Sequence, residues 1–308
     1  MKVKKVQILM ATYNGENFLK AQLDSLIEQK EVHVKILISD DGSTDNTLEI
    51  IKLYQKTLGH DKIYYIDGPQ KGFMQNFLNL IENADEDCDY YAFSDQDDIW
   101  CKDKLKVAIT QLENLDDQLP SLYCSRTELI NANGYHIGYS PWFKKRPDFK
   151  NALIQSIAGG NTMVFNQTSY QLLRALVYSN NIVSHDWWLY LIISGAGGIV
   201  TYDPLPKTFY RQHHTNLVGA NNGLSAKIRR LYLMMQGRFK TWNDENIICL
   251  MNNKHVLTPE NQRILEQFIL VRKKTMVEKF FLLKNLKLYR QTLLGNCGLY
   301  FGFLFNKV

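Results

Sequence analysis

Cysteine is scarce in this sequence and gives no structural framework. The five cysteines stand at positions 88, 101, 124, 249 and 297, without a C-x-x-C pair among them. This spacing argues against a zinc cluster and against a set of disulfides. The cysteines therefore favour a reducing compartment such as the cytosol.

Long apolar runs are also missing. The two most hydrophobic stretches, residues 189–200 and 293–305, fall short of the roughly 18 apolar residues that a spanning helix needs, and glycine interrupts both. Residues 1–15 place basic residues before an apolar run, but that run is too short for a signal peptide. We expect a first strand there and no integral membrane segment.

Disorder is not expected, because the chain is 45% hydrophobic and 22% charged, close to the averages of folded proteins. The net charge of +5 is unevenly distributed. Residues 224–308 hold 15 Lys or Arg against 5 Asp or Glu, a net charge of +10, and the rest holds 21 against 26, a net charge of −5. We predict a domain at residues 1–223 and a basic helical region at residues 224–308.

Strand-like and helix-like segments alternate in the first part of the chain. Apolar residues at helical spacing, such as Leu19 and Leu23 or Phe73 and Phe77, separate the strand-like runs. This alternation predicts an α/β fold with a mostly parallel sheet. Further along we expect helices at residues 103–115 and 167–178, strands at 121–125 and 162–165, and an irregular stretch from 126 to about 157. The first four predicted strands are residues 6–10, 34–38, 63–66 and 90–93.

Polar residues follow three of these strands directly, at residues 11–16, 39–43 and 94–98. In sheets of this kind the carboxyl ends of the strands form the ligand-binding crevice. We therefore expect the three polar segments to face one cleft.

The third segment carries Asp95, Asp97 and Asp98 within four residues. Neighbouring carboxylates repel and raise one another's pKa unless a cation or hydrogen bonds offset them. Mg²⁺ or Mn²⁺ suits such a site, because both prefer oxygen ligands and leave coordination positions for phosphates. The alternative is an acidic surface turn, although the position after an apolar strand favours the metal.

Several motifs together resemble one known family. They are ATYNGENFLKAQLDSLIEQ, ISDDGSTDNT, FSDQDDIW, GGNTMVF, HDWW and FYRQHHTN, spread over residues 6–216. In this order they resemble the nucleotide-sugar-binding domain of family-2 inverting glycosyltransferases, which have the GT-A (Rossmann-like) fold. The variants SDQDDIW, HDWW and YRQH are most similar to bacterial rhamnosyltransferases of cell-wall or capsular polysaccharide synthesis.

The resemblance implies a nucleoside pocket at the first two strand ends. Tyr13 would lie near the base, Glu16 near the ribose, and Asp40 would accept a hydrogen bond from the pyrimidine N–H. The alternative is structural, with a tight turn at Asn14 and a helix start after Asp41. The implied pocket residues are Thr12, Tyr13, Asn14, Glu16, Asp40 and Asp41, with Asp95 beside the donor diphosphate.

The same resemblance assigns the metal and the diphosphate. Asp95 and Asp97 would hold Mg²⁺ or Mn²⁺, Arg211 would bind phosphate oxygens, and His213 would be a further ligand of the metal. The sequence departs from the usual pattern at His214, where a glycine is expected, so the choice between the two histidines stays open, with His213 preferred.

Asp186 matches the position of the general base that deprotonates the acceptor hydroxyl. The alternative is that HDWW only begins a helix, with Asp186 as an acidic residue of the first turn and the tryptophans in the core. The residues implied for the acceptor or the sugar are Asp98, Gly160, Asn161, Trp187 and Trp188.

The basic region fits several partners. Nucleic acid is not expected, because no zinc finger or aromatic RNA-binding pattern is present. Apolar residues from Leu282 to Leu293 at helical spacing, with lysines opposite, predict one cationic amphipathic helix that binds an anionic membrane surface. Solvated helices that form a homo-oligomer are the alternative.

These expectations combine into one predicted enzyme, a peripheral protein on the cytoplasmic face of the cell membrane. It would transfer L-rhamnose from dTDP-β-L-rhamnose to a lipid-linked saccharide with inversion. A UDP-hexose donor and a non-catalytic module that binds a glycan or a partner protein are the alternatives.

Overall fold

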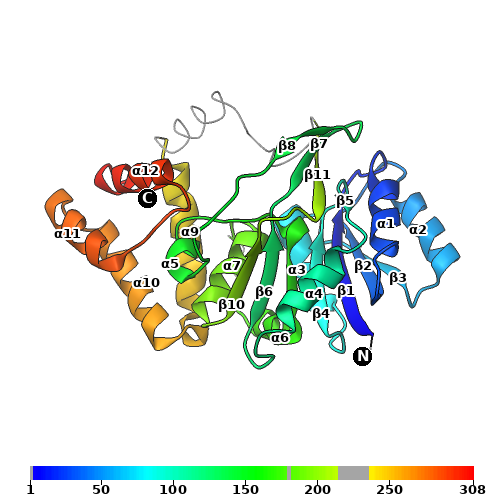
Figure 1. Cartoon of the computed structure of the whole chain (residues 1–308), viewed down its shortest axis with the longest axis horizontal. Coiled ribbons are helices and arrows are strands. Elements are labelled where there is room, and N and C mark those ends of the chain that lie inside the picture. Colours follow the sequence, from blue (N-terminus) through cyan, green and yellow to red (C-terminus); the bar gives the residue numbers. More distant parts are fainter. Residues whose placement is uncertain (1–2, 179–181, 214–235) are drawn as a thin grey trace. The chain divides into compact units, whose positions relative to one another are not determined.

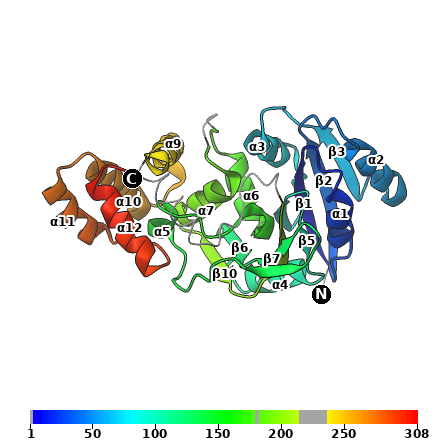
Figure 2. The same ribbon diagram turned by 90° about the horizontal axis from the view of Figure 1, so that it is seen from above.

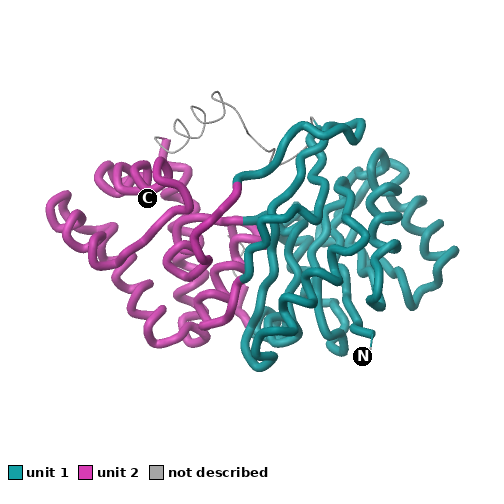
Figure 3. The backbone as a smooth tube through the Cα atoms, in the orientation of Figure 1, with its two compact units in different colours: residues 1–141, 158–175, 201–219 teal, residues 142–157, 176–200, 220–308 magenta. Residues whose placement is uncertain are grey.

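The structure is a computed structural model that describes residues 3–178, 182–213 and 236–308. Its contacts divide the chain into two compact units (Figure 3). Unit 1 comprises residues 1–141, 158–175 and 201–219, and unit 2 comprises residues 142–157, 176–200 and 220–308. The domain boundary predicted after residue 223 lies outside the described residues, and unit 2 takes in two segments that precede it.

Unit 1 is built on a seven-stranded sheet of order β10-β6-β9-β4-β1-β2-β3 (Figure 1). The strands β1, β2, β3 and β4 run parallel, and the short β9 is antiparallel to β4 and β6. The predicted α/β class with a mostly parallel sheet is confirmed. The strands are β1 (Lys4–Thr12), β2 (Val32–Asp40), β3 (Ile63–Asp67), β4 (Tyr90–Ser94), β6 (Ser121–Ser125), β9 (Val164–Asn166) and β10 (Ile199–Asp203).

Helices cover both faces of this sheet. Alternate side chains of β1 and β2, such as Ile8 and Ile36, pack with Leu23 of α1 and Leu105 of α4 in one core. On the other face Phe93 of β4 meets Phe77 of α3, with ring centroids 5.3 Å apart. Figure 2 shows α1 and α3 on opposite sides of the sheet. The helices are α1 (Leu19–Ile27), α2 (Thr47–Leu58), α3 (Phe73–Asn83), α4 (Lys104–Leu112) and α6 (Gln167–Arg174).

A second sheet of four short strands has the order β5-β11-β7-β8. The irregular stretch predicted from residue 126 is therefore wrong for β7 and β8, which form a hairpin. Gly134 closes its turn with a φ of +86° and donates to the carbonyl of Asn131. Strands of four residues, one of them exposed to solvent, give little periodicity in the sequence. The dipeptide Asn133-Gly134, which is typical of hairpin turns, was the signal that could have predicted the hairpin. The strands are β5 (Ile99–Trp100), β7 (Glu128–Asn131), β8 (His136–Tyr139) and β11 (Thr208–Gln212).

Unit 2 is helical, as predicted for the C-terminal region. Its helix α7 is buried along almost its whole length, and the later helices form a core that includes Leu265 and Phe268. No helix in the described ranges is both long enough and apolar enough to cross a membrane. The helices are α5 (Phe149–Ala152), α7 (His185–Gly195), α9 (Arg238–Asn252), α10 (Pro259–Arg272), α11 (Met276–Leu286) and α12 (Leu293–Leu304).

The single helix predicted from Leu282 to Leu293 is wrong. Helix α11 ends at Leu286, because Lys287 adopts a left-handed conformation with a φ of 53°. The following segment is fixed by side chains of unit 2: the amide of Asn151 donates to the carbonyl of Tyr289 over 2.9 Å. Apolar residues of two successive helices and their connection happened to fit one helical period.

His185 begins α7, and its burial leads us to expect that acid destabilises unit 2. Burial lowers the pKa of its imidazole to about 4, from an ordinary value of 6.5. On acidification the imidazole therefore takes up a proton at a higher pH in the unfolded chain than in the folded chain. The contribution of this residue to the free energy of unfolding is fully present above pH 6.5 and is lost as the pH falls towards 4. We expect a loss of about 2 kcal/mol between pH 7.5 and 5 from this residue.

Urea unfolding of the wild type and of His185→Gln across this pH range measures the effect. The variant is expected to lose less stability between pH 7.5 and 5 than the wild type, whatever its stability at pH 7.5. His33→Gln, at an exposed position, is the matched control and should keep the wild-type dependence. Equal acid sensitivity in wild type and His185→Gln would contradict the assignment.

Candidate active site

The predicted nucleoside pocket begins where β1 and β2 end level with each other, since Thr12 pairs with Asp40 in the sheet. The buried carboxylate of Asp40 is held at this edge of the sheet by hydrogen bonds. Its Oδ2 accepts from the hydroxyls of Thr12 (2.8 Å) and Ser43 (2.6 Å), and its Oδ1 accepts from the Ser43 N–H (2.8 Å). A carboxylate has about four acceptor positions, so Asp40 can accept one further donor.

Asp41 anchors a neighbouring loop. Its two carboxylate oxygens accept from the N–H groups of Gln70 (2.6 Å) and Gly72 (2.8 Å). Its own N–H donates to the carbonyl of Thr12. The side chain thus supports the strand-end loops, and its implied place in the nucleoside pocket stays a prediction.

Asn14 and Glu16 connect the end of β1 to the start of α2. Asn14 has a φ of 46°, and its side-chain oxygen accepts from the Thr44 N–H over 2.8 Å. One carboxylate oxygen of Glu16 accepts from the backbone and side-chain N–H groups of Asn46, the residue before α2. These contacts match the structural alternative, a turn and a helix start. Binding of a nucleoside by the same residues stays a prediction.

Tyr13 projects into solvent from a fixed backbone. Its ring is 57% exposed, while the amide of Gln96 brackets its peptide groups: the Tyr13 N–H donates to Gln96 Oε1 (2.8 Å) and Gln96 Nε2 donates to the Tyr13 carbonyl (2.9 Å). A Cβ at Gly15 would lie 2.4 Å from Gln96 Oε1, so this clamp needs glycine there. Gln96 was missed by sequence reasoning, although it stands between two of the predicted aspartates.

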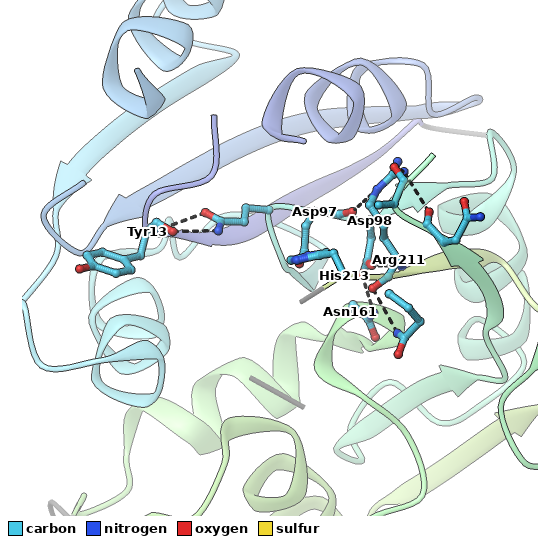
Figure 4. A network of polar contacts seen from close by, with 10 residues as sticks. Tyr13, Asp97, Asp98, Asn161, Arg211 and His213 are labelled. Carbon is cyan, nitrogen blue, oxygen red and sulfur yellow. Dashed lines mark hydrogen bonds and ion pairs between the residues drawn. The ribbon is translucent and has the colours of Figure 1, made fainter. Parts of the chain in front are cut away.

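Asp97 and His213 come together although they are far apart in sequence. Asp97 Oδ2 lies 2.7 Å from His213 Nε2, and both side chains are largely buried. Figure 4 shows the pair beside Asp98, Asn161 and Arg211, with Tyr13 to one side. A carboxylate oxygen and an imidazole nitrogen at this distance form a donor set that suits Mg²⁺ or Mn²⁺, so the residues fit the predicted metal.

In the part of the chain that the structure describes, Asp95 does not join this pair in a compact group of three ligands. Within the described ranges the ligand atoms of Asp95, Asp97 and His213 do not all lie within 4.8 Å of one another. The residues that do meet this limit are Asp85, Asp87 and Cys88, which precede β4, at the opposite end of that strand. Lys5 and Lys35 already form ion pairs with those aspartates, so that group is an ordinary salt-bridged cluster.

Asp98 is completely buried beneath this pair. Its Oδ2 accepts from the amide of Asn161 (2.5 Å) and its Oδ1 from the Arg211 N–H (3.0 Å). Burial, and then the charge of Asp97, raises the pKa of Asp98 to about 7. These contacts show Asp98 stabilising the acidic loop, and its implied role towards the acceptor or the sugar stays a prediction.

Lys104 lies in the same buried layer and was also missed. Its ammonium group donates to the carbonyl of Asn161 over 2.5 Å and lies 3.1 Å from the ring centroid of Trp100. Burial lowers the pKa of Lys104 well below its usual value. No sequence pattern singles out a lysine in the first turn of a helix, so only the structure identifies it. Asn161, predicted with Gly160 near the sugar, links Lys104 to Asp98.

Arg211 is buried and holds backbone groups. Its Nε donates to the carbonyl of Asp97 (2.9 Å) and its Nη1 to that of Ala132 (2.8 Å), while the guanidinium lies 4.9 Å from the ring centroid of Phe18. Burial lowers the pKa of Arg211. The side chain therefore joins the acidic loop to the turn between β7 and β8, and its predicted phosphate contact stays a prediction.

A pocket of about 400 Å³ opens beside the Asp97–His213 pair. This volume is within the range of small-ligand sites. Three of the five lining residues carry amide side chains. The lining residues are Asn131, Ala132, Asn133, Gln212 and His213.

Asp186 belongs to the first turn of α7 in unit 2 and accepts from the Trp187 N–H over 2.6 Å. Trp187 and Trp188 are 5% and 1% exposed, and the Trp187 Nε1 donates to the carbonyl of Ala152. Burial leaves neither ring a face for a sugar. The tryptophans are core residues, as in the structural alternative, and the prediction that they stack on a sugar is not supported. His214 lies outside the described residues.

Known proteins resemble this chain in sequence. The model of the family described as "Glycosyl transferase family 2" matches residues 7–173. The dTDP-rhamnosyl transferase RfbG of Shigella flexneri is 37% identical over 244 residues, which cover 73% of this chain and 78% of that protein. A putative teichuronic acid biosynthesis glycosyltransferase of Bacillus subtilis, TuaG, is 31% identical over 33% of this chain and 39% of its own length.

Solved structures resemble it in fold. Staphylococcus aureus TarS 1-349 in complex with UDP-GlcNAc aligns with a TM-score of 0.53 and 16% identity, over 76% of this chain and 67% of its own. The mannosyltransferase PcManGT of Pyrobaculum calidifontis, in complex with GDP-Man and Mn²⁺, aligns with a TM-score of 0.52 and 15% identity, over 100% and 86%. The predicted GT-A fold is confirmed.

Proposed function

Because the chain belongs to glycosyl transferase family 2, we propose that it transfers L-rhamnose from dTDP-β-L-rhamnose to a hydroxyl of a lipid-linked saccharide, in cell-wall or capsular polysaccharide synthesis. The 37% identity to a dTDP-rhamnosyl transferase over most of both chains carries this proposal. The proposed site of action is the cytoplasmic face of the cell membrane.

The donor would bind at the strand ends of unit 1. Asp40 has an acceptor position left for the pyrimidine N–H, and the exposed ring of Tyr13 can cover the base. Asp97 and His213, with Asp95 nearby in sequence, would hold Mg²⁺ or Mn²⁺. When bound, the ion neutralises charge on the departing nucleoside diphosphate. The mannosyltransferase with the same fold was solved with Mn²⁺, which supports a divalent metal.

The proposed reaction is a single displacement with inversion. The acceptor oxygen forms a bond to the anomeric carbon while the bond from that carbon to the diphosphate oxygen breaks. The proton of the acceptor hydroxyl passes to the carboxylate of Asp186, and the nucleoside diphosphate leaves as an anion. A β-linked donor then yields an α-L-rhamnosyl product, which proton NMR of the anomeric centre identifies.

Calorimetric titration with dTDP and UDP, each with and without Mn²⁺, tests the donor. We expect Mn²⁺-dependent binding of dTDP about tenfold or more tighter than that of UDP, because the pocket must distinguish pyrimidines through a few direct contacts. Turnover should then occur with dTDP-β-L-rhamnose and not with UDP-glucose or UDP-N-acetylglucosamine. Preference for UDP would be consistent with a glycosyltransferase but would contradict dTDP-β-L-rhamnose as the donor. Failure to bind either nucleotide would favour a non-catalytic module.

A further inference from the structure

Helices α11 and α12 of unit 2 expose an unusual number of large apolar side chains. On α11, Val277, Phe280 and Phe281 are 70%, 61% and 64% exposed. On α12, Leu294 is 79% exposed and Phe301 is also exposed, and its ring centroid lies 4.3 Å from that of Phe305, the exposed residue that follows the helix. We call these two surfaces the apolar face of α11 and the apolar face of α12.

Helix α12 is apolar on both sides. Its inner side is buried, with Phe303 packed edge-on against Phe268 of α10. Its outer side presents Leu294 and Phe301, which share one side of the helix because they are seven residues apart, and Phe305 just after the helix stacks against Phe301. The helix sequence LLGNCGLYFGFL contains no charged residue. A helix that is apolar all round is normally covered on all sides, so the outer side needs a partner.

The length of the two helices excludes a transmembrane arrangement for them. Helix α12 has 12 residues and α11 has 11, which correspond to about 18 Å or less at 1.5 Å per residue. The hydrocarbon core of a bilayer is about 30 Å thick. Short helices with one exposed apolar face instead lie in the plane of a membrane surface.

The charge beside these faces is positive. Residues 276–308 hold five Lys or Arg residues and one acidic residue, Glu278. Lys284 and Lys287 are exposed. Glu278 is engaged elsewhere: it pairs with Lys274 over 3.1 Å and caps α11 together with Thr275. A second copy of this chain would bring the same cations to these faces, whereas anionic lipid headgroups complement them.

We propose that the apolar faces of α11 and α12 dock on the surface of an anionic lipid bilayer. The Phe and Leu side chains enter the boundary between headgroups and acyl chains, and Lys284 and Lys287 contact lipid phosphates. Lys279 ties the two helices together, since its buried ammonium group donates to the carbonyl of Phe303 over 3.0 Å. The docking residues belong to unit 2 and the proposed donor residues to unit 1, and docking would give a transferase access to acceptors held in a membrane.

Co-sedimentation of the full chain with vesicles tests the proposal. Vesicles of phosphatidylcholine mixed with phosphatidylglycerol should bind the wild type at least about tenfold more tightly than phosphatidylcholine alone. Two double variants separate the contributions: Phe301→Ser with Phe305→Ser removes apolar contact, and Lys284→Gln with Lys287→Asn removes charge. Each should weaken binding to the anionic vesicles about tenfold.

The matched control is Leu53→Ser with Leu205→Ser, which removes exposed leucines of unit 1 and should leave vesicle binding unchanged. Unchanged binding in both α11–α12 variants would overturn the proposal. A second result would also overturn it: the wild type is a dimer by light scattering, the double variant Phe301→Ser with Phe305→Ser is a monomer, and the wild type does not bind vesicles. In that case a second copy of the chain covers the two apolar faces. Nucleotide titration of the same variants reports separately on the donor site.

Discussion

Replacing Asp97 by Asn is expected to reduce metal-dependent transfer about a thousandfold in kcat/KM, while the protein stays folded. The substitution keeps the shape of the side chain and its ability to form a hydrogen bond with His213, whichever tautomer the imidazole adopts. It removes the negative charge that the proposed metal ion needs, and a metal contributes several kcal/mol to such reactions, with each 1.36 kcal/mol worth a factor of ten. Turnover of dTDP-β-L-rhamnose at increasing Mn²⁺ concentrations measures the loss.

The fold should not be destabilised by this change. The charge of Asp97 contributes to the raised pKa of the buried Asp98, so its removal relieves a repulsion between neighbours. Asp87→Asn is the matched control, because Asp87 precedes the same strand and forms an exposed pair with Lys5. Wild-type turnover and Mn²⁺ binding by Asp97→Asn would remove this residue from the metal site.

Two of the three clustered aspartates, Asp97 and Asp98, have different environments, which helps to explain how the chain tolerates them. Asp98 is buried and accepts two N–H bonds, and burial together with the charge of Asp97 raises its pKa, which favours the neutral form. Asp97 faces His213. The charge that remains at the strand end is therefore smaller than three carboxylates suggest, and a divalent cation can neutralise it.

The parallel sheet was predictable from the sequence because of a repeating local pattern. Short apolar runs form the strands, polar residues follow several of them, and a segment with helical spacing comes next. The same local patterns predicted that the polar segments after these strands would face one cleft, and Thr12 and Asp40 at the ends of β1 and β2 lie side by side. The hairpin of β7 and β8 was not predicted, because strands of four residues with exposed side chains carry almost no periodicity.

Contacts between distant residues were predicted only where a family resemblance supplied them. His213 was assigned to the metal on that basis, and the structure brings it to Asp97. The bracket that Gln96 forms around Tyr13 and the buried Lys104 beneath Asp98 have no such signal. Both depend on which side chains the folded chain brings together, a property that spacing along the sequence does not encode.

Replacing Asp186 by Asn is expected to lower kcat by two to four orders of magnitude, the usual contribution of a general base. Asparagine keeps the oxygen that accepts from the Trp187 N–H, so the first turn of α7 should be preserved. Donor binding should be unchanged, because the proposed donor residues belong to unit 1. Single-turnover rates together with dTDP titration measure chemistry and binding separately.

Glu260→Gln provides the matched control, because Glu260 is the acidic residue in the first turn of α10, another helix of unit 2. Each substitution removes one negative charge near a helix N-terminus, and such a charge stabilises the helix by about 0.3–1 kcal/mol. The two variants should therefore show similar decreases in the free energy of unfolding. Only Asp186→Asn should lose turnover. If both variants turn over at the wild-type rate, Asp186 is an acidic residue of a helix start, and the base must be sought elsewhere in the same fold.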